Sequence, residues 1–234
     1  LGGAGSGTQA RAGFEAAAAL WSSVLTGEET IRLDVGFQDL GKNILGSTAS
    51  STSNQSYTSV RQALADNSTS TTDRSAVASL GTSLGFLSNE AGNCATFVGC
   101  RAIDPDSRTY DHDNTRDNNY LSVNNALGKA LGLVDDTGYA DAYITFSSRY
   151  KWDFNSDNGV SRSTYDFVGI AAHEIGHALG FVSGVDLVDQ HVGLAGLDGI
   201  AWGTVLDLFR YTGNQRDWTV GGSPCISVDK GKNC

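Results

Sequence analysis

The sequence predicts an α+β fold, because it contains two strongly helical segments and two segments with the alternation of strands. Residues 165–179 form the strongest helical segment, and Gly180 stands where that helix can end. Residues 140–147 and 30–37 each carry an apolar side chain at every second position, which predicts half-buried strands. Residues 9–25 place five apolar side chains on one helical face: Phe14, Ala17, Ala18, Trp21 and Leu25.

The remaining segments are shorter. Four further helices are predicted, at residues 57–65, 73–84, 121–131 and 204–211. The Ser- and Thr-rich stretch 46–57 fits either a flexible loop or a polar strand at a sheet edge. We find no internal repeat and no clear linker, so one domain with two lobes is expected rather than two domains.

The charge of the chain excludes some partners. Its 234 residues carry a net charge of −10, with a pI of about 4.7. A polyanion or an anionic membrane would repel such a chain, so we expect no nucleic-acid partner. No run of about 18 apolar residues occurs, so no membrane span is expected.

Cysteine and methionine usage indicates secretion. The chain has no Met, so Leu1 is expected to follow a cleavage, either of a signal peptide or pro-segment or at an artificial boundary. Four cysteines form two close pairs, Cys94 with Cys100 and Cys225 with Cys234. We expect two disulfides and a secreted, extracellular protein, with free thiols as the alternative. The spacing does not fit a structural zinc site.

The segment 172–180 carries the chemistry. His173 and His177 are four residues apart, so a helix presents both imidazoles on one face. That arrangement suits two nitrogen ligands on one zinc ion. Glu174 lies beside the first ligand and can act as the general base that takes a proton from the attacking water. The alternative is an amphipathic helix that merely carries these residues, but the apolar flanks favour a buried helix with a functional edge.

At this point the sequence resembles a known family. Residues 165–181 resemble the active-site helix of metzincin metalloproteases, and residues 140–146 resemble the preceding strand in matrixins. The resemblance implies a zincin-like fold, in which a twisted, mostly parallel sheet packs on long helices. It also implies one catalytic domain, 1–234, with a cleft between a larger lobe, about 1–180, and a smaller lobe, about 181–234.

The sequence departs from the family in two places. Typical metzincins have a third zinc-binding His where this chain has Ser183, and they have a Met-turn that a chain without Met lacks. The run 180–183 is closer to leishmanolysin-like enzymes and to secreted bacterial metalloproteases, where the third His follows a long insertion. The third ligand is therefore expected to be Asp186, His191 or a residue beyond Cys234, with the last favoured.

Two acidic segments are candidates for calcium. Asp153, Asn155 and Asp157 alternate before Gly159, although the full EF-hand pattern is missing. A second cluster holds several carboxylates close in sequence: Asp104, Asp106, Asp111, Asp113 and Asp117. Both segments can equally be solvated loops, and His112 within the second is expected to be a solvated loop residue.

The sequence thus predicts a zinc-dependent endopeptidase acting on protein or peptide substrates. The first alternative is a catalytically silent binding or adhesion domain, suggested by Ser183 and the absent Met. The second is a zinc hydrolase that does not act on peptides. We expect the edge strand that binds substrate between Phe146 and Phe154, whereas oligomeric state and side-chain preference have no signature in the sequence.

Overall fold

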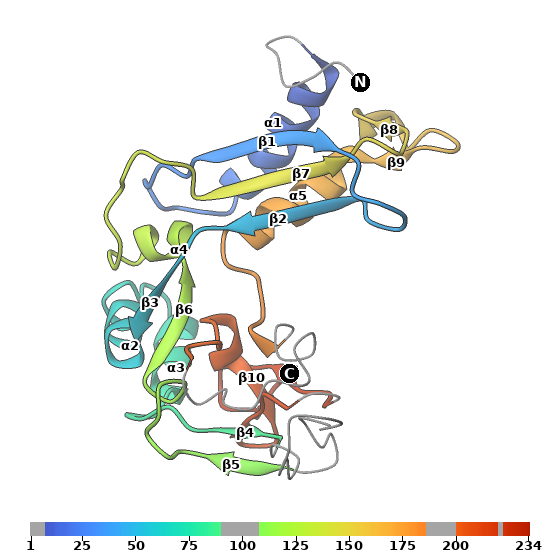
Figure 1. The fold of residues 1–234 in the computed structure, drawn as a ribbon. Coiled ribbons are helices and arrows are strands. Elements are labelled where there is room, and N and C mark those ends of the chain that lie inside the picture. The colour runs from blue at the N-terminus through green and yellow to red at the C-terminus, as the bar shows by residue number, and fades with distance from the viewer. Residues whose placement is uncertain (1–7, 90–107, 186–199, 220–221) are drawn as a thin grey trace. The chain divides into compact units, whose positions relative to one another are not determined.

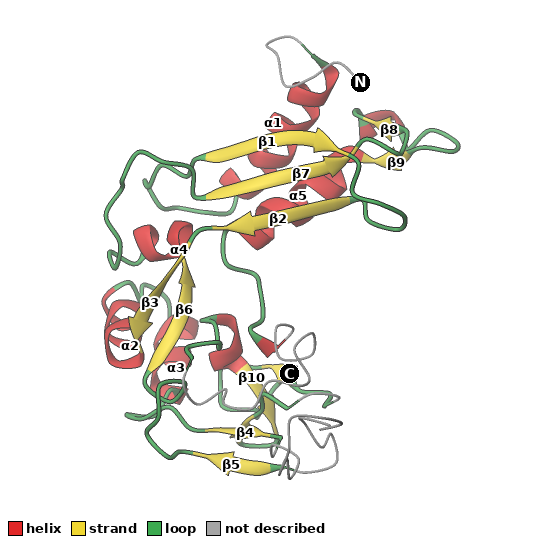
Figure 2. Ribbon diagram, in the orientation of Figure 1, coloured by secondary structure: helices red, strands yellow, loops and turns green. Residues whose placement is uncertain are grey.

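The computed structural model describes residues 8–89, 108–185, 200–219 and 222–234 (Figure 1). These residues combine helices with short strands, which confirms the predicted α+β class (Figure 2). The chain divides into two compact units. Unit 1 comprises residues 1–51, 124–130 and 134–181, and unit 2 comprises residues 52–123, 131–133 and 182–234. The expected single domain with lobes 1–180 and 181–234 stays a prediction.

Unit 1 is built on a three-stranded sheet with the order β1-β7-β2. Strand β1 (Leu33–Gln38) runs parallel to β7 (Ala142–Ser147), and β2 (Gly46–Ser50) runs antiparallel to β7 on its other side. One of the two strand pairings is parallel and the other antiparallel, so the expectation of a mostly parallel sheet is met only in part. Residues 39–45 connect β1 to β2, and a connection of that length is too short for the crossover that a parallel return requires.

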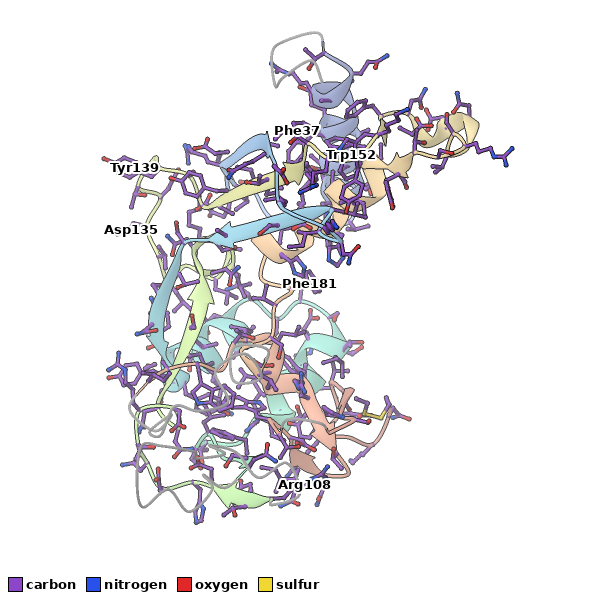
Figure 3. The ribbon with its side chains drawn as sticks, turned by 45° about the vertical axis from the view of Figure 1, so that its right-hand side comes forward. Phe37, Arg108, Asp135, Tyr139, Trp152 and Phe181 are labelled. Atoms are coloured by element: carbon purple, nitrogen blue, oxygen red, sulfur yellow. A yellow bond between two sulfur atoms is a disulfide. The ribbon has the colours of Figure 1, made fainter. Side chains whose placement is uncertain are left out.

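Helices α1 (Gln9–Ser22) and α5 (Phe167–Ala178) lie behind this sheet in Figure 1. Ala142, Ile144 and Phe146 of β7 are buried, while Tyr143 is exposed, as the alternation predicted. Four aromatic rings from separate elements pack together in this core: Phe37, Phe146, Trp152 and Phe167. Figure 3 labels Phe37 and Trp152 among them. Each fully buried apolar side chain stabilises the fold by about 1.5–3 kcal/mol, so this core anchors α5 firmly.

A buried charge network joins the start of the sheet to α4 (Asn125–Ala130). Lys129 is only 4% exposed, and its Nζ lies 2.7 Å from Asp141 Oδ2 and 2.6 Å from the Thr30 carbonyl oxygen. Asp136 accepts two hydrogen bonds from Arg32 Nη1, at 2.6 and 2.7 Å. The Asp141 carboxylate and the Thr30 carbonyl oxygen satisfy the Lys129 ammonium group, which would otherwise be costly to bury.

A short parallel pair extends unit 1 beyond its main sheet. Strand β8 (Trp152–Asp153) pairs with β9 (Tyr165–Asp166), and the 3-10 turn η1 (Ser156–Asn158) lies in the loop between them. Both strands of a two-stranded sheet are edge strands, and the expectation that the substrate-binding edge lies between Phe146 and Phe154 stays a prediction. The edge strands of the three-stranded sheet are β1 and β2, because β7 is paired on both sides.

Unit 2 consists of short elements. Its helices within the described residues are α2 (Tyr57–Asp66), α3 (Thr71–Ser79) and the 3-10 helix η3 (Leu206–Phe209). Two two-stranded sheets pair β3 (Thr52–Ser56) with β6 (Tyr120–Asn124), and β4 (Phe86–Ser88) with β5 (Thr109–Asp111). A third sheet has the order β11-β10-β12, with β10 (Arg210–Thr212), β11 (Gln215–Arg216) and β12 (Cys225–Ile226).

Aromatic stacking and a disulfide between described residues stabilise unit 2. Phe86 stacks on Trp218 with ring centroids 3.9 Å apart, and Trp202 packs edge-on against both rings. Cys225 and Cys234 form a disulfide, which confirms that predicted pair. The other predicted pair, Cys94 with Cys100, lies outside the described residues.

Two predicted helices were wrong in part. Residues 121–131 begin as strand β6 and become α4 only from Asn125, because Leu121 and Val123 are buried on alternate positions against β3 and its surroundings. Residues 204–211 form η3 followed by β10. Both segments have apolar side chains that fit either period, which makes short runs ambiguous.

Across the described ranges, none of the helices has both the length and the apolar character that crossing a bilayer would demand.

The Asp136 contacts generate a prediction about acid stability. Hydrogen bonds from Arg32 lower the pKa of Asp136 from 3.8 to about 2. A carboxylate with a depressed folded-state pKa stabilises the protein above its unfolded-state pKa, and this contribution is lost as the pH falls from about 3.8 to 2. We therefore expect Asp136→Asn to flatten the decline in urea midpoint over that window.

The control is Asp135→Asn, which changes the neighbouring exposed carboxylate. It should leave the slope of the urea midpoint against pH unchanged. Equal slopes for the parent and Asp136→Asn would show that the Arg32 contact does not persist in solution.

Candidate functional site

Helix α5 ends in a well-defined turn just after His177. The Phe181 N–H donates to Gly176 O at 3.0 Å and the Gly180 N–H donates to His177 O at 3.1 Å, the pattern of a Schellman motif. Gly180 has a φ of +107°, a value that side chains rarely allow. Phe181 therefore lies immediately beyond the helix end (Figure 3). The sequence had predicted this termination at Gly180.

The two histidines converge on the surface of unit 1. Their Nε2 atoms lie 3.0 Å apart, and the ring centroids lie 4.5 Å apart. His173 is exposed and His177 is half-buried, so a ligand and water can reach both rings. The sequence prediction that one helical face carries both imidazoles is thus met by the geometry.

The helix end also orients His177. Its Nδ1 lies 2.8 Å from the Phe181 carbonyl oxygen. Because a carbonyl only accepts, Nδ1 must carry the proton, and the lone pair of Nε2 is then directed at the space shared with His173. This kind of outer contact fixes the tautomer of zinc-binding histidines. Asn124 Nδ2 donates to His177 O at 3.0 Å and further secures the last helical turn.

The donor set fits zinc. Two nitrogens bound to one tetrahedral zinc at about 2.0–2.1 Å stand about 3.3 Å apart. The observed 3.0 Å between the Nε2 atoms differs little from that value, and a small rotation of either ring removes the difference. His173 and His177 can therefore hold zinc without any change in α5.

Glu174 points towards β2. It is only 5% exposed, although a carboxylate is costly to bury. Thr48 Oγ1 donates to Glu174 Oε2 at 2.7 Å and lies 3.0 Å from the Glu174 main-chain oxygen. In the described part of the chain, no basic side chain forms an ion pair with Glu174. The carboxylate of the residue that follows His173 is thus buried with a neutral hydroxyl as its partner.

The opposite side of α5 is fixed by α1. Trp21 Nε1 donates to the Ala172 carbonyl oxygen at 2.8 Å, one residue before His173. A Cβ at Gly176 would lie 3.1 Å from Trp21 Cζ2, so glycine lets the indole approach the helix. The Trp21 ring also packs on Phe181, with centroids 5.4 Å apart.

Sequence reasoning missed the supporting residues Thr48, Gly46, Trp21 and Asn124. Trp21 was identified only as part of an apolar helical face, and Thr48 lay in a stretch assigned equally to loop or strand. Period-two spacing of 46, 48 and 50 was the available signal, but it becomes informative only once β2 is paired with β7.

Ser183, which was compared with the third-ligand position of typical metzincins, belongs to a buried network in unit 2. Its Oγ donates to Asp207 Oδ1 at 2.6 Å and accepts from Arg210 Nη1 at 3.1 Å. Asp207 is fully buried, and its other oxygen accepts from the Gly184 and Thr204 N–H groups at 2.8 Å. The Ser183 hydroxyl is therefore committed to this network. The other candidates, Asp186 and His191, lie outside the described residues.

The acidic segments differ from each other. Carboxylate oxygens of Asp111, Asp113 and Asp117 lie within 4.8 Å of one another, whereas Asp104 and Asp106 lie outside the described residues. Asp113 and Asp117 already accept hydrogen bonds from Thr115, and His112 is exposed as expected.

In the other segment, the Asp153 oxygens accept from the N–H groups of Asn155 and Ser161 at 3.1 and 2.8 Å. Asn155 in turn accepts from the Asp157 N–H at 3.1 Å. These contacts hold the loop in shape through its own main chain, as expected for an Asx turn. Calcium binding at either segment stays a prediction.

Comparison with known proteins gives no family assignment: no protein-family model matches the chain, and neither curated proteins nor solved structures yield a match. The functional interpretation therefore depends on the residues and geometry described above.

The histidine geometry generates a prediction about metal binding. Replacing His173 or His177 by Ala should weaken zinc binding by roughly a hundredfold or more, since even losing an outer contact to a ligand costs about 10–100-fold. Zinc affinity is measured by competition with a chromophoric chelator.

His112→Ala is the matched control, because it removes an exposed histidine from unit 2. It should bind zinc like the parent. Unchanged zinc affinity in His173→Ala and His177→Ala would place the metal elsewhere.

Proposed function

We propose that the chain is a secreted zinc-dependent endopeptidase of the metzincin type, with His173 and His177 as zinc ligands and Glu174 as the general base. One observation carries the proposal. Two imidazole Nε2 atoms converge to 3.0 Å on an accessible helix face, and the adjacent carboxylate is buried without a cationic partner in the described residues. A dication bound by the two rings would compensate that charge.

Zinc bound here would polarise a carbonyl and lower the pKa of water towards about 7. Glu174 accepts the proton of the attacking water and can return it to the leaving amine. Because Phe181 holds His177 through Nδ1, the lone pair of His177 Nε2 stays directed at the position proposed for the metal. A third protein ligand is required for a hydrolytic zinc site, and it is expected from Asp186, His191 or a residue beyond Cys234.

The edge of β2 supports a peptide as the substrate. The Ser147 N–H donates to Leu45 O, and the Ser51 N–H donates to Asp141 O. Because paired and unpaired positions alternate in an antiparallel ladder, the main-chain groups of Gly46, Thr48 and Ser50 face away from β7. An extended peptide can pair with these groups beside Glu174, which gives affinity that is largely independent of side chains.

The alternative is a catalytically silent binding domain of the same fold, motivated by Ser183 and the missing Met. A silent domain has no need of a buried carboxylate next to exposed histidines, so the Glu174 environment favours the hydrolase. A hydrolase acting on other bonds shares the zinc chemistry but has no use for an open strand edge. Zinc content together with cleavage of a denatured protein separates these three functions.

The general-base assignment predicts the behaviour of Glu174→Gln. The amide keeps the size of the side chain but cannot accept the proton, so hydrolysis of a denatured protein should fall by about 10²–10⁴-fold. Zinc content, measured by atomic absorption, should remain that of the parent. Near-normal turnover by the variant would be incompatible with Glu174 as the base.

The third ligand is tested by comparing zinc dissociation constants for Asp186→Ala and His191→Ala with that of the parent. If either residue completes the site, its loss should weaken zinc binding steeply. If the ligand lies beyond Cys234, neither change should matter and the 234-residue chain should bind zinc weakly. We expect the second result, because the run 180–183 resembles enzymes whose third His comes late.

A further inference from the structure

Strand β2 brings two of its residues against the Glu174 side chain. Gly46, Thr48 and Ser50 are partly buried and alternate with the exposed Ser47 and Ala49, so the first set faces α5. The strand is held in register by β7, with Thr48 opposite Ile144. Any group carried by β2 towards α5 is therefore fixed by the sheet.

Thr48 contacts Glu174 at two points. Its hydroxyl lies 2.7 Å from Oε2 and 3.0 Å from the main-chain oxygen of the same residue. A hydrogen bond to a carboxylate is about twice as strong as one between neutral groups. Since Thr is branched at Cβ, its χ1 is restricted and the hydroxyl has little freedom to leave. The carboxylate is thus held relative to the helix that bears it.

Gly46 provides the space for that carboxylate. A Cβ at residue 46 would lie 2.8 Å from Glu174 Cδ and 2.9 Å from Cγ, and it would collide with Oε1. Such contacts are too short for carbon, so any larger residue displaces the Glu174 side chain or the strand. Thr48 holds one carboxylate oxygen, and Gly46 leaves the other room directly above its Cα.

We propose that Gly46 and Thr48 are positioning residues for Glu174, which hold its carboxylate in the orientation required for proton transfer. The inference rests on the proposed function and adds how the general base of this site is oriented. A glutamate has three rotatable side-chain bonds, and a base must lie within hydrogen-bond reach of the proton that it takes. A displacement of about 1 Å can cost about a hundredfold in rate.

The test uses Thr48→Val, which keeps the shape but removes the donor, and Thr48→Ser, which keeps the hydroxyl. Thr48→Val should lower kcat by roughly ten- to a hundredfold with KM nearly unchanged, since only the orientation of the base is lost. Thr48→Ser should restore most of the rate. Ser47→Ala is the matched control, because it removes a hydroxyl from the opposite face of the same strand. Its kcat should equal that of the parent.

Two further readouts separate positioning from a merely structural contact. Zinc affinity should be the same in the parent and Thr48→Val, because neither histidine contacts Thr48 through a hydrogen bond in the described residues. The double variant Thr48→Val/Glu174→Gln should be no slower than Glu174→Gln alone, because Thr48 acts through the carboxylate. If Thr48→Val does not fold, the Thr48→Ala and Thr48→Ser pair gives the same comparison.

The outcomes distinguish failure of the positioning role of Thr48 from failure of the proposed function. An active parent, an inactive Glu174→Gln and an unchanged kcat in Thr48→Val overturn the positioning role while the proposed function stands. Additive rate losses in the double variant overturn it as well. A parent that binds zinc but cleaves no peptide contradicts the proposed function, and the positioning role falls with it.

Discussion

The angular spacing of an α-helix constrains the whole site. His173 and His177 lie on one exposed face of α5, and Glu174 follows His173 by one residue, so it points about 100° further round the helix. That direction leads into the interface between α5 and the sheet, where most neighbours are apolar. A carboxylate placed there needs a polar partner and space. Thr48 and Gly46 supply both from the edge strand, so the register of β2 is tied to the chemistry of the helix.

The turn that ends α5 orients His177, as strand β2 orients Glu174. Gly180 lets the chain reverse, which brings the Phe181 carbonyl oxygen to 2.8 Å from His177 Nδ1. Helix termination and the tautomer of His177 therefore depend on one glycine. Trp21 reinforces the arrangement, since it donates to the Ala172 carbonyl and packs on Phe181. A substitution of Trp21 in α1 can thus alter the positions of His173 and His177 without replacing either residue.

Local periodicity was sufficient to predict α1, β1, β7 and α5, because each has a long pattern of a single period. It failed for residues 121–131, where a short apolar run fits strand and helix equally and pairing with β3 decides. Spacing within one helix was sufficient to predict that His173 and His177 share one face of α5, whereas their role and that of Glu174 stay predictions. The partners of Glu174 could not be predicted, because Thr48 is 126 residues away and its role depends on strand register. Pairing across such a distance leaves no mark in the local sequence.

The network around Asp207 bears on where the third zinc ligand originates. Ser183 uses its proton for Asp207 and accepts from Arg210 and from the Val185 N–H. To bind a metal, the hydroxyl would have to give up its bond to a carboxylate that is fully buried. Leaving such a group less satisfied costs about 1–3 kcal/mol or more, and a neutral hydroxyl is a poor zinc ligand in return. Exchanging the hydrogen bond to Asp207 for a bond to zinc is therefore unfavourable, because the first is strong and the second is weak. Ser183 is therefore committed to internal packing, and if the proposed zinc site exists, its third ligand is expected from a residue other than Ser183.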